Sequence, residues 1–288
     1  MNKYLISVDV EGITGVINRN FAKKDGKYYQ LGCDYMTSDV NAVVQGILDV
    51  DVDAWIVVRD AHEDAVNLDL EKLHPRANLI QGWSPVQNML AGLDQTFIGA
   101  FLVGYHASGK NNKAVLGHTL NSRVHYVKIN GKFVNETGIA ALYAGSYNVP
   151  VAFISGDDCA VNEAREQLGD IVGVVVKQSF ARDCAISLPL EQAQLLLEKS
   201  AADAVIKLQQ NHFPIFKVTA PITLEVGFYN IGFKVSVFQS LSEILSFDPD
   251  YKFDYEKLAI TFSADNVSEV LQRLNMLMFL VYGISAVS

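Results

Sequence analysis

Residues 4–12 read Tyr4-Leu5-Ile6-Ser7-Val8-Asp9-Val10-Glu11-Gly12, an apolar run that ends in two carboxylates and a glycine. A run of this kind predicts a buried central strand of a parallel sheet. Side chains alternate along a strand, so Asp9 and Glu11 point to the same side if the extended path continues. Because two acids held together at a strand end repel each other, we expect a cation between them.

Two later apolar runs also end in residue types that bind metals. The run 54–58 leads into Asp60 and His62, and the run 97–103 leads into His106. If the three strands are parallel, their carboxyl ends share one edge, which is where open α/β sheets bind ligands. The mixture of carboxylate and imidazole favours zinc, manganese or cobalt over calcium at this edge.

The first three quarters of the chain alternate between strand and helix patterns. Beyond the three strands above, we expect helices at 34–50, 139–146, 160–168 and 189–210, and strands at 149–155 and 172–176. The dipeptide Asn130-Gly131 between two short apolar runs predicts a hairpin turn. The alternation predicts an α/β fold with a mostly parallel sheet that has helices on both faces.

The pattern changes after Pro214. We expect strands at 222–226, 234–238 and 258–262, and then a closing helix at 265–282. The sequence therefore predicts two domains. Residues 1–212 would form an α/β metal-binding catalytic domain, and residues 213–288 would form a smaller β-rich α+β subdomain with a closing helix.

The composition restricts the partners of the chain. Of its 288 residues 50% are apolar and 19% are charged, and the formal net charge is −9. The negative charge argues against nucleic acid and against an anionic membrane surface as partners. The apolar stretch 276–284 is shorter than the roughly 20 residues that a membrane span needs. Subunit interfaces would account for the apolar balance.

The cysteines and the N-terminal residues suggest a compartment. Cys33, Cys159 and Cys184 are widely spaced and odd in number, which is typical of a reducing compartment rather than of a disulfide framework. The first residues show no leader pattern. We therefore expect a cytoplasmic protein.

Several short motifs, taken in order, carry a family resemblance. They are Asp9-Val10-Glu11-Gly12-Ile13-Thr14-Gly15, Asp60-Ala61-His62, Leu73-His74-Pro75, Gly104-Tyr105-His106-Ala107, Gly117-His118-Thr119 and Gly131-Lys132-Phe133-Val134-Asn135-Glu136-Thr137-Gly138. In these motifs the chain resembles the DppA-type D-aminopeptidases, binuclear zinc metallopeptidases that assemble as a decameric ring. The likeness continues through 156–158 and 176–178, and it weakens over about the last 70 residues.

The resemblance implies a set of site residues. The metal ligands that it implies are Asp9, Glu11, His62, His106 and Glu136. They would hold two zinc ions per subunit, with manganese or cobalt as alternatives, and Asp9 would bridge the ions. His118 would be an additional catalytic histidine. Glu136 has an alternative role, because a carboxylate in a first helical turn is favoured by the helix dipole. Asp60 would orient a ligand histidine.

The resemblance implies an aminopeptidase that hydrolyses the N-terminal residue of short peptides, D-amino-acid-containing ones in particular, and that self-associates as a homodecamer. Two alternatives remain open at this point. One is another two-metal hydrolase, a phosphoesterase or an amidase, although a phosphoesterase needs extra cations and only Arg59, Lys110 and Lys113 offer them. The other is a non-catalytic oligomeric metal-binding protein. For Lys177 and Arg182 the sequence leaves structural, substrate-binding and intersubunit roles open.

Overall fold

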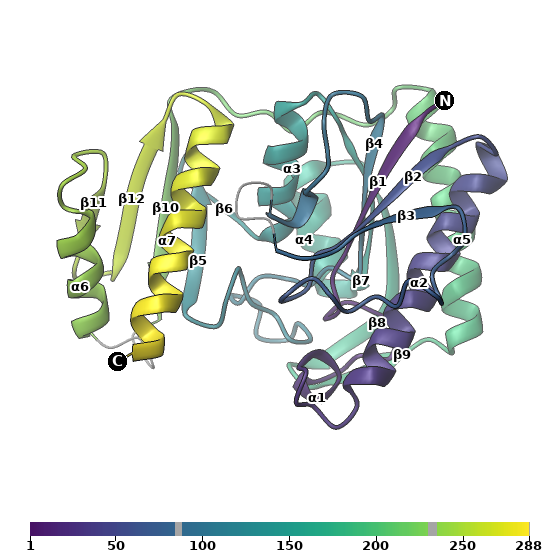
Figure 1. The fold of residues 1–288 in the computed structure, drawn as a ribbon, viewed down its shortest axis with the longest axis horizontal. Coiled ribbons are helices and arrows are strands. Elements are labelled where there is room, and N and C mark those ends of the chain that lie inside the picture. The colour runs from purple at the N-terminus through teal and green to yellow at the C-terminus, as the bar shows by residue number, and fades with distance from the viewer. Residues whose placement is uncertain (84–87, 230–234, 288) are drawn as a thin grey trace. The chain divides into compact units, whose positions relative to one another are not determined.

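The computed structural model describes residues 1–83, 88–229 and 235–287 (Figure 1). The chain falls into two compact units. Unit 1 comprises residues 1–107, 111–117 and 137–217, and unit 2 comprises residues 108–110, 118–136 and 218–288. None of the helices in the described part of the chain combines the length and the apolar character that a membrane span requires.

Unit 1 is built on a seven-stranded sheet with the strand order β3-β2-β1-β4-β7-β8-β9. Its strands are β1 (Lys3–Val8), β2 (Trp55–Asp60), β3 (Ala77–Ile80), β4 (Gly99–Val103), β7 (Val151–Asp157), β8 (Val172–Ala181) and β9 (Cys184–Ser187). The first six run parallel, and only β9 is antiparallel to its neighbour β8. The expected central position of the strand at residues 4–8 is confirmed, because β1 lies between β2 and β4.

Helices cover both faces of this sheet. They are α1 (Arg19–Ala22), α2 (Tyr29–Val50), the 3₁₀ turn η1 (Asn88–Leu90), α3 (Glu136–Ser146), α4 (Asp158–Leu168) and α5 (Leu190–Gln209). Two adjacent residues of β8 show the two faces. Val174 belongs to the core that contains α2 and α5, whereas a Cβ on Gly173 would lie 2.5 Å from Val161 of α4. The predicted α/β class, with a mostly parallel sheet and helices on both faces, is confirmed.

Unit 2 contains a five-stranded antiparallel sheet with the order β11-β12-β10-β5-β6. Its elements are β5 (Val124–Ile129), β6 (Lys132–Val134), β10 (Ile222–Phe228), α6 (Val235–Leu245), β11 (Lys252–Asp254), β12 (Ala259–Ala264) and α7 (Val267–Val287). The predicted hairpin is confirmed, because Asn130 and Gly131 have φ angles of 47° and 80° between β5 and β6. The β-rich character and the closing helix agree with the sequence.

The predicted strand at 234–238 is wrong. Residues from Val235 onward form the helix α6, and Lys234 lies outside the described residues. Phe238, Leu241 and Leu245 are buried at the spacing of one helical face. The five residues on which the prediction rested were too few to separate this period from the alternation of a strand.

The predicted division of the chain at residue 212 stays a prediction about domains. The compact units follow a different division, since residues 118–136 cluster with the C-terminal part of the chain. The reason is strand pairing: β5 is hydrogen-bonded to β10, with Val127 opposite Val226. A pairing between segments so distant in sequence leaves no mark in local composition.

Candidate metal centre

The carboxyl ends of β1, β2 and β4 meet at one edge of the unit 1 sheet. Val8 is in register with Asp60 on one side and with Val103 on the other. The pairing continues one residue further, since Asp9 donates its backbone N–H to Val103 at 2.9 Å. This edge is the one that the sequence predicts, and it carries the residues that follow each strand.

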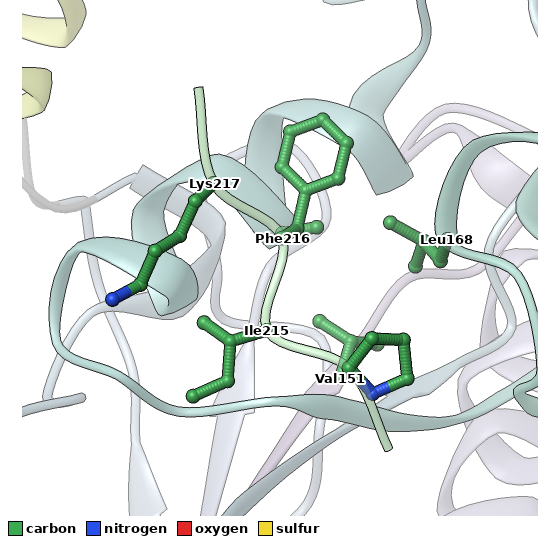
Figure 2. Close-up of a pocket in the computed structure, with 7 residues that line it drawn as sticks. Val151, Leu168, Ile215, Phe216 and Lys217 are labelled. Carbon is green, nitrogen blue, oxygen red and sulfur yellow. The ribbon is translucent and has the colours of Figure 1, made fainter. Parts of the chain in front are cut away.

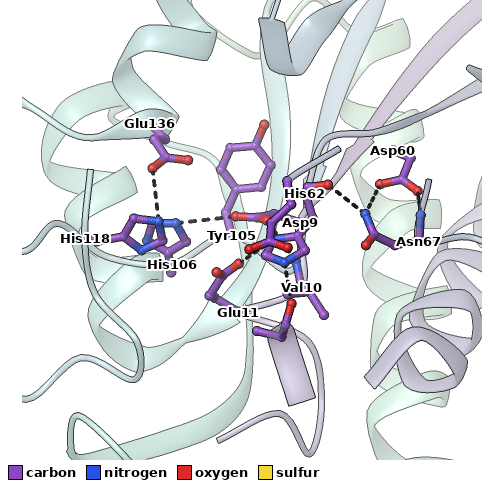
Figure 3. A network of polar contacts seen from close by, with 12 residues as sticks. Asp9, Val10, Glu11, Asp60, His62, Asn67, Tyr105, His106, His118 and Glu136 are labelled. Carbon is purple, nitrogen blue, oxygen red and sulfur yellow. Dashed lines mark hydrogen bonds and ion pairs between the residues drawn. The ribbon is translucent and has the colours of Figure 1, made fainter. Parts of the chain in front are cut away.

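Asp9 lies between two histidine rings (Figure 3). Its Oδ1 is 3.0 Å from Nδ1 of His62, and its Oδ2 is 3.4 Å from Nε2 of His106. Glu11 approaches the first ring, with its Oε2 3.1 Å from Nδ1 of His62. All four side chains are buried. Each oxygen of the Asp9 carboxylate therefore faces a different imidazole.

The outer nitrogens of both rings lie against backbone carbonyls. Nε2 of His62 is 2.8 Å from the oxygen of Ala22, and Nδ1 of His106 is 3.0 Å from the oxygen of Ala107. A neutral imidazole donates from one nitrogen and offers a lone pair on the other. In the neutral ring, which is the form that binds a metal, these contacts assign the N–H to the outer nitrogen and leave the inner nitrogen, which faces Asp9, as the ligand atom.

Burial and neighbouring charges shift the pKa values of Asp9 and His62. Burial, followed by the charge of Glu11, raises the pKa of Asp9 to about 7. Burial lowers the pKa of His62, but the charges of Glu11 and Asp9 outweigh it and raise that pKa well above its usual range. The cluster thus binds positive charge. Ligand atoms of Asp9, Glu11 and His106 lie within 4.8 Å of one another, and this carboxylate and imidazole donor set fits zinc.

Asp60 does not have the role that the sequence suggests. Its two oxygens accept hydrogen bonds from the backbone and side chain of Asn67 and from the N–H of Leu68, whereas the ring nitrogens of His62 lie against Asp9, Glu11 and the carbonyl of Ala22. Asn67 also donates to the backbone oxygen of His62 at 2.7 Å. Asp60 therefore closes the loop that carries His62, and the carbonyl of Ala22 orients the ring. The sequence offered no signal for Asn67.

Unit 2 holds the other two predicted site residues. Nε2 of His118 lies 3.9 Å from Oε1 of Glu136, and the same oxygen accepts the N–H of Leu120 at 2.7 Å. Leu120 has a φ of 65°, a left-handed conformation that is uncommon for a bulky side chain and recurs at functional sites. Glu136 is the first residue of α3. This position is compatible with both roles considered for Glu136, a carboxylate that the helix dipole favours and a metal ligand.

A separate pocket of unit 1 has a different character (Figure 2). Its volume is about 210 Å³, and it is lined by Ala141, Val151, Leu168 and residues 214–217. The ammonium of Lys217 donates to the side chain of Asn148. None of the lining residues belongs to the predicted ligand set. This pocket therefore offers neither a carboxylate nor an imidazole to a metal.

Comparison with known proteins agrees with this geometry. A family model, peptidase M55, described as D-aminopeptidase, matches residues 2–274. A D-aminopeptidase of Bacillus subtilis (strain 168) is 36% identical over 231 residues, which cover 80% of this chain and 82% of the relative. The solved structure of the Zn-dependent D-aminopeptidase DppA from Bacillus subtilis, described as a self-compartmentalizing protease, is similar with a TM-score of 0.90 at 28% identity. That match covers 97% of this chain and 98% of the solved chain.

Proposed function

The chain belongs to the D-aminopeptidase family, and from this premise we propose that it is a zinc-dependent aminopeptidase. It hydrolyses the N-terminal residue of short peptides, with D-amino-acid-containing peptides as the preferred class. Family membership does not favour the alternatives, which were a phosphoesterase, an amidase and a non-catalytic metal-binding protein.

One observation carries the proposal: Asp9 presents one oxygen to His62 and the other to His106. In their neutral form both rings turn a lone pair toward it, because their other nitrogens lie against carbonyls. A carboxylate in this position suits two ions that share it. We propose two zinc ions per subunit, with Asp9, Glu11, His62 and His106 as ligands from unit 1. The resemblance adds Glu136 as the fifth ligand.

The residues of this chain prepare the site for peptide hydrolysis. When bound, zinc supplies polarisation of the scissile carbonyl and a water with a pKa near about 7. Burial of Asp9 and Glu11 keeps bulk water away and strengthens the electrostatic interactions in the site. His118 is 26% exposed at its side chain, so substrate can reach it. It is proposed to move a proton or to stabilise the developing oxyanion.

We further propose self-association as a homodecameric ring in the cytoplasm. The solved relative is described as self-compartmentalizing. Large apolar side chains such as Leu195, Phe247 and Phe279 are more than half exposed on the single chain. Exposed apolar side chains of this kind are typical of surfaces that become buried between subunits. The three free cysteines fit a reducing compartment.

The test combines metal analysis with a stereochemical assay. Elemental analysis of the purified protein is expected to give about two zinc ions per chain. The protein should hydrolyse D-alanyl p-nitroanilide faster than the L-isomer and leave a generic phosphodiester intact. His62→Ala should lose both zinc and activity, whereas His74→Ala, in a loop outside the ligand set, should keep both. Zinc-free protein with full activity, or a preference for the phosphodiester, would refute the proposal.

A further inference from the structure

The segment that carries Asp9 and Glu11 has no regular structure of its own. Residues 9–18 form neither helix nor strand. Two backbone bonds tie the start of this segment to the end of β4: Asp9 donates to Val103 at 2.9 Å, and Gly12 donates to Gly104 at 2.7 Å. Because much of the segment is buried, its remaining carbonyl and N–H groups need partners from elsewhere in the fold.

Lys177 of β8 supplies partners for the carbonyls. Its ammonium donates to the backbone oxygens of Glu11, Ile13 and Val16 at 2.6, 2.9 and 2.6 Å. An ammonium has three N–H groups, and each of them meets one carbonyl. Lys177 is 1% exposed. It thus acts as a cation that is tethered to the sheet and enclosed by the ligand-bearing segment.

Asp39 of α2 holds the same segment through its N–H and hydroxyl groups. Its Oδ2 accepts the backbone N–H and the hydroxyl of Thr14, both at 2.9 Å. Asp39 and Thr14 are completely buried. The middle of the segment is therefore bonded to α2 through Thr14 and to β8 through the neighbouring carbonyls.

These two charges are costly to bury, and this cost argues for a role. Burial lowers the pKa of Lys177 to about 8, although the charges of Asp157, Asp39 and Glu11 oppose the shift. Burial likewise raises the pKa of Asp39 to about 6. A buried lysine and a buried aspartate add little stability compared with apolar packing. What they do provide is a fixed backbone path from residue 11 to residue 16.

We propose that Lys177 and Asp39 are positioning residues of the metal centre, which fix the backbone of residues 11–16 so that the carboxylates of Asp9 and Glu11 are aimed before an ion binds. The inference rests on the proposed function, since it concerns the same zinc site. The direct link is the carbonyl of Glu11, which Lys177 holds: a rotation of that peptide unit would also turn the ligand side chain. Neither positioning residue contacts substrate in this proposal.

The test uses cobalt(II) in place of zinc, because its visible absorption spectrum reports the ligand geometry. Parent protein is compared with Lys177→Met and Thr14→Val, the second of which removes only the hydroxyl bond to Asp39. We expect Lys177→Met to bind cobalt about 10- to 100-fold more weakly, because removal of a residue that orients a metal ligand weakens metal binding by this factor in other sites. Thr14→Val should bind it about two- to tenfold more weakly, the equivalent of one hydrogen bond. Both variants should show an altered spectrum.

Val205→Ala is the matched control, because it removes buried methyl groups from α5 but none of the hydrogen bonds that hold the segment. It should lower the melting temperature and leave the cobalt affinity and spectrum of the folded protein unchanged. Parent-like affinity and spectrum in folded Lys177→Met and Thr14→Val would overturn the inference. If Lys177→Met does not fold, Thr14→Val decides alone. A parent protein that binds no cobalt would instead show that the proposed metal centre itself is wrong, and the inference would fall with it.

Discussion

At the scale of single residues, the two histidines proposed as metal ligands are held in opposite ways. His62 directs Nδ1 toward Asp9 and His106 directs Nε2 toward it. The carbonyls of Ala22 and Ala107 determine which nitrogen of each ring faces Asp9, because each carbonyl accepts the N–H of the other nitrogen. The backbone thus fixes which nitrogen is available to a metal.

Asn67 provides a test of this backbone control. Asn67→Ala removes the amide that bridges Asp60 and the carbonyl of His62, and it leaves buried oxygens without a donor. We expect a loss of about 1–3 kcal/mol in the free energy of unfolding and a zinc affinity about tenfold weaker, measured by urea denaturation and by competition with a chelator. Asn78→Ala is the control, since Asn78 also donates an amide bond to a carbonyl, that of Ile56. Equal zinc affinity in the two variants would contradict the expectation.

A second test distinguishes the proposed catalytic role of His118 from the proposed metal-ligand role of Glu136. If His118 acts on substrate and Glu136 binds metal, His118→Ala should lower kcat by about 100-fold or more and keep its zinc. Glu136→Ala should lose zinc as well as activity. Inductively coupled plasma analysis beside the D-alanyl p-nitroanilide assay distinguishes the two. Zinc loss in His118→Ala would make this histidine a ligand, and full zinc in Glu136→Ala would leave that residue with its helix-dipole role.

At the scale of elements, the ends of three strands meet around one carbonyl. A Cβ on Gly12 would lie 2.1 Å from the backbone oxygen of Tyr105, and a Cβ on Gly156 would lie 2.3 Å from the same oxygen. Only glycine permits such a close approach of the backbone at both positions. The segments after β1 and β4 and the end of β7 are thereby packed together beside Glu11 and His106.

Gly12→Ala is expected to disrupt this contact. The added methyl group must displace the backbone that leads into His106, and we expect a loss of about 1–3 kcal/mol in the free energy of unfolding together with weaker zinc binding. Gly283→Ala is the control, because its Cβ would meet nothing within 4 Å and alanine favours the helix α7 by up to about 1 kcal/mol. Thermal unfolding with and without zinc measures both effects. A Gly12→Ala protein that matches the parent in stability and zinc content would show that the loop adapts.

The sequence predicts elements well where one strand or helix shows a complete local pattern. The strand at 4–8, and the acids and histidines that follow three parallel strands, could be placed at one sheet edge for this reason. Glu136 and His118 required the family resemblance, since neither follows a strand of that sheet. Lys177 could not be assigned to the loop of Glu11, because 166 residues separate the two. The helix α6 was missed because the five residues 234–238 are too few to distinguish a helical period from the alternation of a strand.

At the scale of the whole molecule, the proposed ring rests on the description of the solved relative as self-compartmentalizing and on the exposed apolar side chains of this chain. Leu195 and Phe247 are 67% and 79% exposed on the single chain, and burial between copies would remove this apolar surface from water. We expect light scattering at micromolar concentration to give about ten times the 31.7 kDa mass of one chain. A chelated sample is the control for zinc-dependent assembly. A monomer under both conditions would refute the ring.

Zinc should also stabilise the whole fold, because the site concentrates buried charge. Without an ion, the mutual repulsion of Asp9 and Glu11 opposes folding and contributes to the raised pKa of Asp9, about 7. Free zinc at about 100 times its dissociation constant should therefore add about 2.7 kcal/mol per site, seen as a higher melting temperature than in chelator.

The pH dependence of this stabilisation follows from the sign of the shift. Asp9 of the metal-free protein takes up a proton as the pH falls through about 7, and His62, whose pKa is raised as well, already holds one. Folding of the metal-free protein is therefore favoured by acid in this range, whereas zinc must displace these protons. The difference in melting temperature between zinc-loaded and chelated protein should shrink as the pH is lowered through about 7. In His62→Ala, which removes one proposed ligand, the response to zinc should be smaller at every pH. An equal response in parent and variant would mean that zinc stabilises the protein at another place.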